Sequence, residues 1–206
     1  FARLLTPTDV GVLILGMGIC SGVGGVATLG LSQALARRIA ELRVAGMAEV
    51  ARRSGGSGML LGIVSGVVAA LAMAAAAPAI ENAFGAARLG DVVRLLTPVA
   101  VGLPVGAAAV GIGRAWGDAG GRAVLREAGG GLLRVGGVVV AAILFRDLGA
   151  VAAGLAVGAL LGEIAYALFV CGKGWSSNVM GRPWDSELTR RLAPFWLMMV
   201  IVQVET

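Results

Sequence analysis

Glu163 is the one carboxylate that the sequence places well inside an apolar stretch, thirteen residues after Ala150 and seven before Val170. At membrane depth an ionised carboxylate is costly unless it is solvated or paired with a cation. Two interpretations are open. Glu163 lines a central cavity, where it contacts a proton, a cation or a hydroxyl group of a ligand, or it makes a structural hydrogen bond or ion pair near the interface.

Arg134 is the nearest cation in the apolar stretch that precedes Glu163. Its planar guanidinium can donate two bonds to a pyrophosphate, or it can extend to the interface as an anchor. A tight turn at 146–149 joins the two stretches. Arg134 lies fifteen residues before Gly149 and Glu163 fourteen residues after it. Both therefore lie about 21–22 Å from the turn, and we expect them to pair if their helix faces match.

Two further polar residues, Gln33 and Arg38, follow the first apolar stretch. They are candidate substrate contacts, with anchoring to lipid headgroups as the alternative. Pro98 and Pro104 interrupt the third apolar stretch, where they predict a kink that is either static or a hinge for alternating access.

Other kinds of chemistry find little support in the sequence. Histidine is absent, and the two cysteines lie within or at the end of apolar stretches, so we expect no metal, no disulfide and no cofactor. Coupling to H⁺ or Na⁺ stays open. The net charge of +5 is not arranged as a basic stripe with interleaved aromatics, so we expect no nucleic-acid partner.

The composition assigns these residues to a membrane protein. The chain is 58% hydrophobic and 14% charged, whereas soluble domains have about 25% charged residues. The uncharged stretch 10–31 is about 33 Å long as a helix, enough to cross a bilayer, and its many glycines allow neighbouring helices to approach closely. We therefore predict one all-α transmembrane bundle of five complete spans and a truncated sixth. The expected spans are 10–31, 59–80, 95–112, 132–145, 150–170 and 192–206.

The first connection has a pattern of its own. Residues 33–53 place apolar and charged side chains at helical spacing, which predicts an amphipathic cytoplasmic helix at the membrane interface. The sequence SGGSG at 54–58 predicts a break after that helix.

Loop charge predicts the orientation of the bundle. Three connections have a net positive charge: 33–56 with +3, 114–134 with +2 and 172–191 with +2. The connections between them, 81–94 and 146–149, are neutral. By the positive-inside rule the three positive loops are cytoplasmic and Phe1 is outside. We therefore expect an upstream helix that is missing here, and treat the chain as a fragment.

Several segments resemble a known family. The turn RLLTPTDVG at 3–11, the segment GLSQALARR at 30–38 and the run RRLAPFWLMMVIVQVE at 190–205 resemble polysaccharide and O-antigen flippases. These belong to the multidrug/oligosaccharidyl-lipid/polysaccharide exporter superfamily. The resemblance implies most of the N-terminal bundle of a twelve- to fourteen-helix exporter in the plasma membrane. It also implies alternating access and, as partners, the bilayer, a polyprenyl-pyrophosphate-linked saccharide and the missing C-terminal half of the chain.

Two alternatives remain beside this flippase hypothesis. One is a cation-coupled exporter of drugs or of a lipid-linked peptidoglycan precursor from the same superfamily. The other is an intramembrane polyprenyl-phosphate glycan enzyme, which requires clustered acids or histidines at the membrane surface. We expect a transporter rather than an enzyme.

Overall fold

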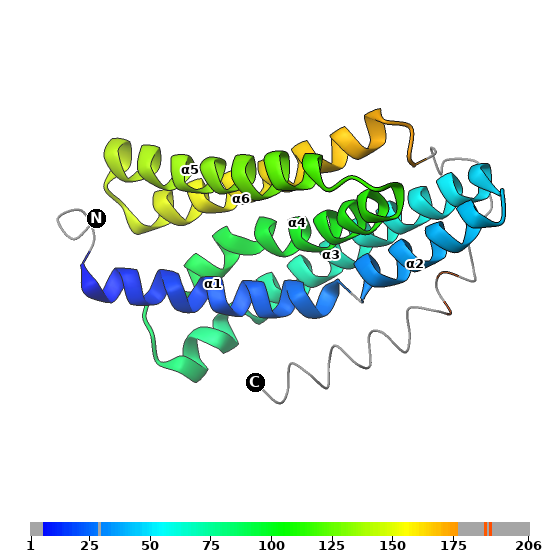
Figure 1. Ribbon diagram of the computed structural model, residues 1–206. Coiled ribbons are helices and arrows are strands. Elements are labelled where there is room, and N and C mark those ends of the chain that lie inside the picture. The colour runs from blue at the N-terminus through cyan, green and yellow to red at the C-terminus, as the bar shows by residue number, and fades with distance from the viewer. Residues whose placement is uncertain (1–5, 29, 177–187, 189, 191–206) are drawn as a thin grey trace.

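The computed structural model describes residues 6–28, 30–176, 188 and 190. These residues form helices and no strand (Figure 1). The helices are α1 (Pro7–Ala27), α2 (Leu31–Val44), α3 (Ala48–Phe84), α4 (Leu89–Trp116), the π-helix η1 (Arg122–Gly129), α5 (Gly130–Phe145) and α6 (Leu148–Gly172). The sixth span predicted at 192–206 lies outside the described residues.

The predicted all-α transmembrane fold is confirmed. Within the described part of the chain, five helical stretches are long and apolar enough to cross a membrane. They run longer than the spans expected from sequence: Pro7–Val44, Ala48–Phe84, Leu89–Trp116, Arg122–Phe145 and Leu148–Gly172. The added length lies mainly beyond the uncharged segments, where polar residues continue the helix.

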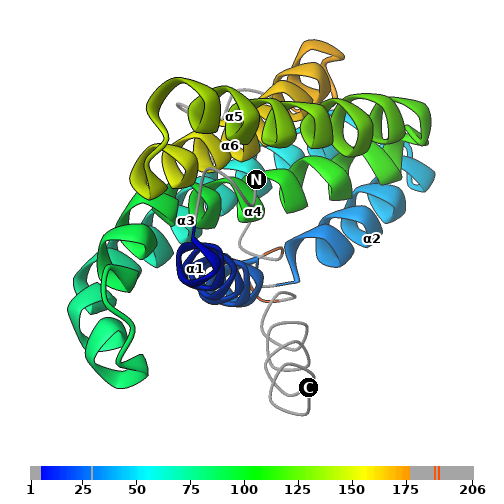
Figure 2. The ribbon, with the colours of Figure 1, turned by 90° about the vertical axis from the view of Figure 1, so that its left-hand side faces the viewer.

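Helix α4 is the centre of the bundle. It packs against α1, α2, α3 and α6, and Figure 2 shows it between α1 and the α5–α6 pair. Pro98 and Pro104 both lie inside this helix. The backbone of Pro104 passes close to Gly62 of α3, so a proline and a glycine lie together in that helix contact. A hinge at either proline stays a prediction.

The amphipathic segment predicted at 33–53 differs from the expectation. A turn at 45–47, with Gly46 at φ +74°, divides it into α2 and the start of α3. The apolar residues Leu31, Leu35 and Ile39 of α2 are fully buried, and α2 packs on α3 and α4. Protein covers these residues of the apolar face, whereas Val44 is 92% exposed. The prediction of one continuous helix over 33–53 was therefore wrong, and its location at the membrane interface stays a prediction.

The break predicted at 54–58 was also wrong, because α3 continues through SGGSG as one helix of 37 residues. All five of these residues are buried. A Cβ at Gly58 would meet the side chain of Leu35, and one at Gly55 would meet the backbone of Trp175. Glycine destabilises a helix that is exposed to water, whereas here the missing side chains make room for neighbouring segments.

Three helices begin at the predicted outer end, where charged side chains connect them. Arg88, just before α4, pairs with Asp9 of α1 at 3.7 Å and with Asp147 of α6 at 3.1 Å. Thr6 and Asp9 form a capping box on α1, and Asp147 caps α6. The backbone N–H of Ala150 and the Arg88 guanidinium lower the pKa of Asp147. The common end of α1, α4 and α6 agrees with the alternating connections predicted from loop charge.

Small residues set the distance between α5 and α6. The sequence places Gly154, Gly158 and Gly162 at four-residue spacing, and all three lie against α5. A Cβ at Gly137 would overlap the backbone carbonyl of Gly154, and one at Gly158 would overlap the carbonyl of Leu133. Because backbone atoms cannot rotate away, this contact tolerates little added volume.

Adjacent glycines of α5 provide a matched test of this contact. Gly137→Ala should lower the free energy of unfolding by about 1–3 kcal/mol through overpacking. Gly136→Ala should not, because Gly136 is exposed and nothing lies near its absent Cβ. Thermal unfolding in detergent can be followed by alkylation of the buried Cys20 in a Cys171→Ser background. Equal melting temperatures for the two variants would contradict the close α5–α6 contact.

The orientation can be tested at two exposed ends of the bundle. In the same Cys171→Ser background, Val44→Cys places a thiol at a residue that is 92% exposed, beside the α2–α3 turn, and Phe84→Cys places one at the opposite end of α3. We expect a membrane-impermeant maleimide to label Phe84→Cys on intact cells and Val44→Cys only after permeabilisation. The opposite pattern would reverse the orientation.

Candidate functional site

Glu163 is buried between α4 on one side and η1 and α5 on the other, with 2% of its surface exposed. Arg126 of η1 binds it through two bonds, from Nε to Oε2 at 2.9 Å and from Nη2 to Oε1 at 3.1 Å. Arg134 of α5 donates a third bond from Nη2 to Oε1 at 3.3 Å. The pairing of Glu163 with Arg134 predicted from their equal distance to the turn is confirmed.

Arg126 was not predicted as a site residue, because residues 114–134 were interpreted as a connection between two spans. In the structure, η1 continues directly into α5, so that Arg122–Phe145 is one helical stretch. The arginines at 122, 126 and 134 are spaced by four and eight residues, which places them near one face of a helix. This spacing is the feature of the sequence from which a role for Arg126 could have been predicted. A π-helix is uncommon, and such segments occur often at functional sites.

Two glycines of α4 make room for the carboxylate. A Cβ at Gly106 would overlap Oε2 of Glu163, and one at Gly102 would lie 3.4 Å from its Cγ. Any larger residue at 106 would push the carboxylate away from Arg126. The carboxylate of Glu163 therefore fits against α4 because residues 102 and 106 of that helix are glycines.

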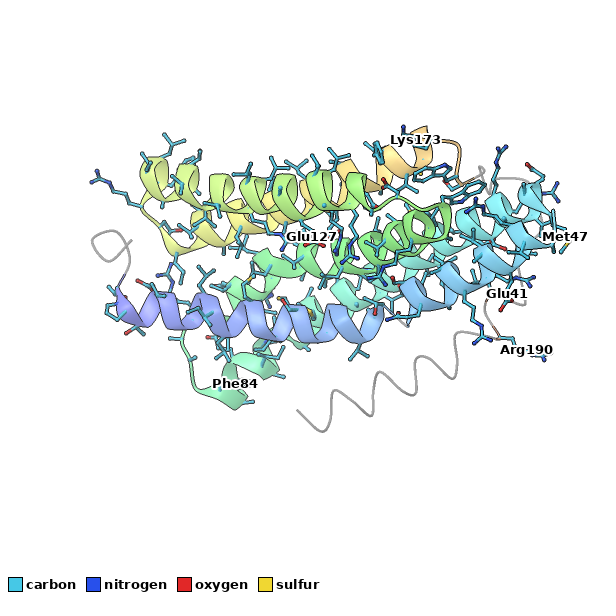
Figure 3. The ribbon with its side chains drawn as sticks, in the orientation of Figure 1. Glu41, Met47, Phe84, Glu127, Lys173 and Arg190 are labelled. Atoms are coloured by element: carbon cyan, nitrogen blue, oxygen red, sulfur yellow. The ribbon has the colours of Figure 1, made fainter. Side chains whose placement is uncertain are left out.

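The charges continue toward the predicted cytoplasmic end. Glu127, which Figure 3 labels between the α5–α6 pair and α4, accepts from Arg126 at 3.3 Å and from Arg122 at 3.4 Å. The side chain of Glu127 is 56% exposed and that of Arg126 20%, against 3% for Glu163. The series therefore leads from the surface to a buried acid.

A cavity of about 430 Å³ opens beside Glu127 at the end of α4. Its lining consists of charged and very small residues: Arg114, Gly117, Asp118, Ala119, Arg122, Ala123 and Glu127. Asp118 is fixed there by the hydroxyl of Tyr166, which donates to it at 3.2 Å, and by the backbone N–H of Gly121 at 2.9 Å.

The other candidate residues lie on different elements. Gln33 is exposed and Arg38 half-buried, both on α2, which packs on α3 and α4, whereas Glu163 lies on α6. The ion pairs described for Glu163 join it to Arg126 and Arg134. A role for Gln33 and Arg38 in binding substrate therefore stays a prediction.

The buried group can hold an anion. Arg126 and Arg134 face Glu163, and Arg126 also pairs with Glu127, which pairs in turn with Arg122. This connected group of three arginines and two carboxylates has a net charge of +1. The Nε atoms of Arg134 and Arg122 are buried and have no hydrogen-bond partner within the described part of the chain. Buried N–H donors without a partner are costly, which makes them available to an acceptor that enters from outside.

Comparison with known proteins gives one family. The polysaccharide biosynthesis protein family matches residues 1–110, which is more than half of the chain. No curated protein and no solved structure gave a match. The matched part covers α1, α2, α3 and most of α4, and the remaining helices complete a multi-pass membrane bundle around the buried carboxylate. The chain belongs to the polysaccharide biosynthesis protein family.

Proposed function

We propose that this chain moves a lipid-linked oligosaccharide across the plasma membrane by alternating access, with the pyrophosphate held by Arg126 and Arg134. The observation that supports the proposal most strongly is the buried Glu163 with two arginine partners inside the helix contact. Membership of the polysaccharide biosynthesis protein family supports a saccharide substrate, and the helices that can span a membrane support a role in export.

The guanidinium groups suit a phosphate for the same reason that they suit Glu163. A planar guanidinium donates parallel bonds to two oxygens, and a carboxylate and a phosphate both present such a pair. In the empty site, Glu163 takes the place of the substrate anion. A pyrophosphate displaces the carboxylate from Arg126 and also meets the unused Nε donor of Arg134.

Entry of the substrate begins at the more exposed arginine. The side chain of Arg134 is 41% exposed and that of Arg126 20%. An arriving anion therefore meets Arg134 first and exchanges with Glu163 at Arg126 afterwards. Once displaced, the carboxylate needs another cation, and a proton or Na⁺ is small enough to reach it. This exchange provides the step at which an ion gradient couples to transport.

Two substitutions in the complete protein test the proposal. Glu163→Gln keeps the shape of the side chain and removes its charge, and Arg134→Ala removes one anion ligand. Each should lower export about tenfold or more, because a charge-assisted hydrogen bond is worth about 1.5–3 kcal/mol. Expression should be unchanged. The measurement is surface polysaccharide together with the lipid-linked intermediate, which should accumulate inside the cell, as we also expect on deletion of the gene.

Arg52→Gln is the matched control. Arg52 is an exposed residue near the start of α3, and its substitution removes the same charge from the same predicted side. It should export normally. A fully active Glu163→Gln protein would remove Glu163 from the site, and an active-site-dependent transferase activity in the purified protein would favour the enzyme alternative.

A further inference from the structure

The cavity at the end of α4 differs in its chemistry from a larger groove elsewhere in the described part of the bundle. A groove between α1 and α3 has a volume of about 790 Å³ and is lined almost entirely by apolar residues of these two helices, such as Ile19, Val23 and Val68. Such a surface suits acyl chains. The cavity beside Glu127 has no large apolar side chain in its lining.

The charges of this cavity are balanced. Arg114 and Arg122 contribute two positive charges, and Asp118 and Glu127 contribute two negative charges. A sugar hydroxyl both donates and accepts hydrogen bonds, so it is matched by arginine donors together with carboxylate acceptors. A phosphate, by contrast, is favoured where positive charge is in excess, as it is around Arg126 and Arg134. The volume of about 430 Å³ falls within the range of about 300–1,000 Å³ for small-molecule sites.

The cavity and the two arginines that bind Glu163 are adjacent. Glu127 lines the cavity and accepts a hydrogen bond from Arg126, which in turn binds Glu163. The cavity lies at the more exposed end of this series, toward the predicted cytoplasmic side. In a lipid-linked saccharide the first sugar is bonded directly to the pyrophosphate, on the side away from the lipid. The two subsites are therefore neighbours, as the pyrophosphate and the first sugar are in the substrate.

We propose that this cavity binds the first sugar of the lipid-linked saccharide, next to a pyrophosphate held by Arg126 and Arg134. The inference rests on the proposed function and adds a saccharide subsite to it. Asp118, fixed by Tyr166 and by Gly121, is a preformed acceptor in the lining of the cavity. Arg114 is an exposed donor on its wall.

Two synthetic probes separate the subsites. Farnesyl pyrophosphate carries the anion alone, and farnesyl pyrophosphate bearing N-acetylglucosamine carries the anion and one sugar. Equilibrium binding of each is measured to the purified protein in nanodiscs. Ala123→Leu fills the cavity without changing charge, and Arg114→Gln removes a donor from its wall. Ala40→Leu, at an exposed residue of α2, is the control for the added volume.

We expect Ala123→Leu to weaken binding of the sugar-bearing probe about tenfold and to leave the bare probe within about twofold of the wild type. Arg114→Gln should act in the same direction, and Ala40→Leu should change neither affinity. If both probes bind the wild type equally, or if the cavity variants weaken both alike, the saccharide subsite is wrong while the pyrophosphate site stands. If the bare probe does not bind but the sugar-bearing probe does, and Ala123→Leu weakens it, the cavity stands and the pyrophosphate site is wrong.

Discussion

A carboxylate buried between membrane helices requires cations, and much of this structure follows from meeting that requirement for Glu163. An unpaired charge in an apolar contact is very costly, and the Coulomb attraction of a partner offsets the cost only if the geometry is good. Arg126 meets it with two bonds and Arg134 with a third. Gly106 leaves the space in which the carboxylate lies. Four different helices contribute these residues: Glu163 lies on α6, Arg126 on η1, Arg134 on α5 and Gly106 on α4. The site therefore exists only in the assembled bundle.

Close helix contacts are the second constraint, and glycine provides them. Between membrane helices the hydrophobic effect contributes little, because lipid is as apolar as the side chains, so packing at short distance stabilises the bundle. Gly62 of α3 lies against the backbone of α4, and Gly137 of α5 lies against Gly154 of α6. The same contacts bring the backbone of α5 near α6, which is what allows the arginine at 134 to reach across to Glu163.

The sequence was sufficient for the features that depend on hydropathy and on distance along the chain. The all-α membrane fold followed from composition, and the pairing of Glu163 with Arg134 followed from equal distances to the turn at 146–149. Rules derived from helices in water were misleading at 54–58, where buried glycines continue α3. Hydropathy also could not show whether the apolar side chains of α2 lie against lipid or against other helices of the protein. Arg126 was missed because a polar stretch was assumed to be a loop, although four-residue spacing placed it near Arg122.

The excess of one positive charge in the buried group has an electrical consequence. In a cell with a negative interior, moving one charge across the membrane is worth about 2.3 kcal/mol per 100 mV. An empty site of charge +1 is drawn toward the cytoplasm. If a pyrophosphate dianion binds and a proton or Na⁺ joins the displaced carboxylate, as proposed above, the loaded site becomes neutral, and the membrane voltage does not oppose the outward step. Under that proposal, a single unbalanced guanidinium lets the membrane voltage favour the inward return of the empty site without hindering the outward step with cargo.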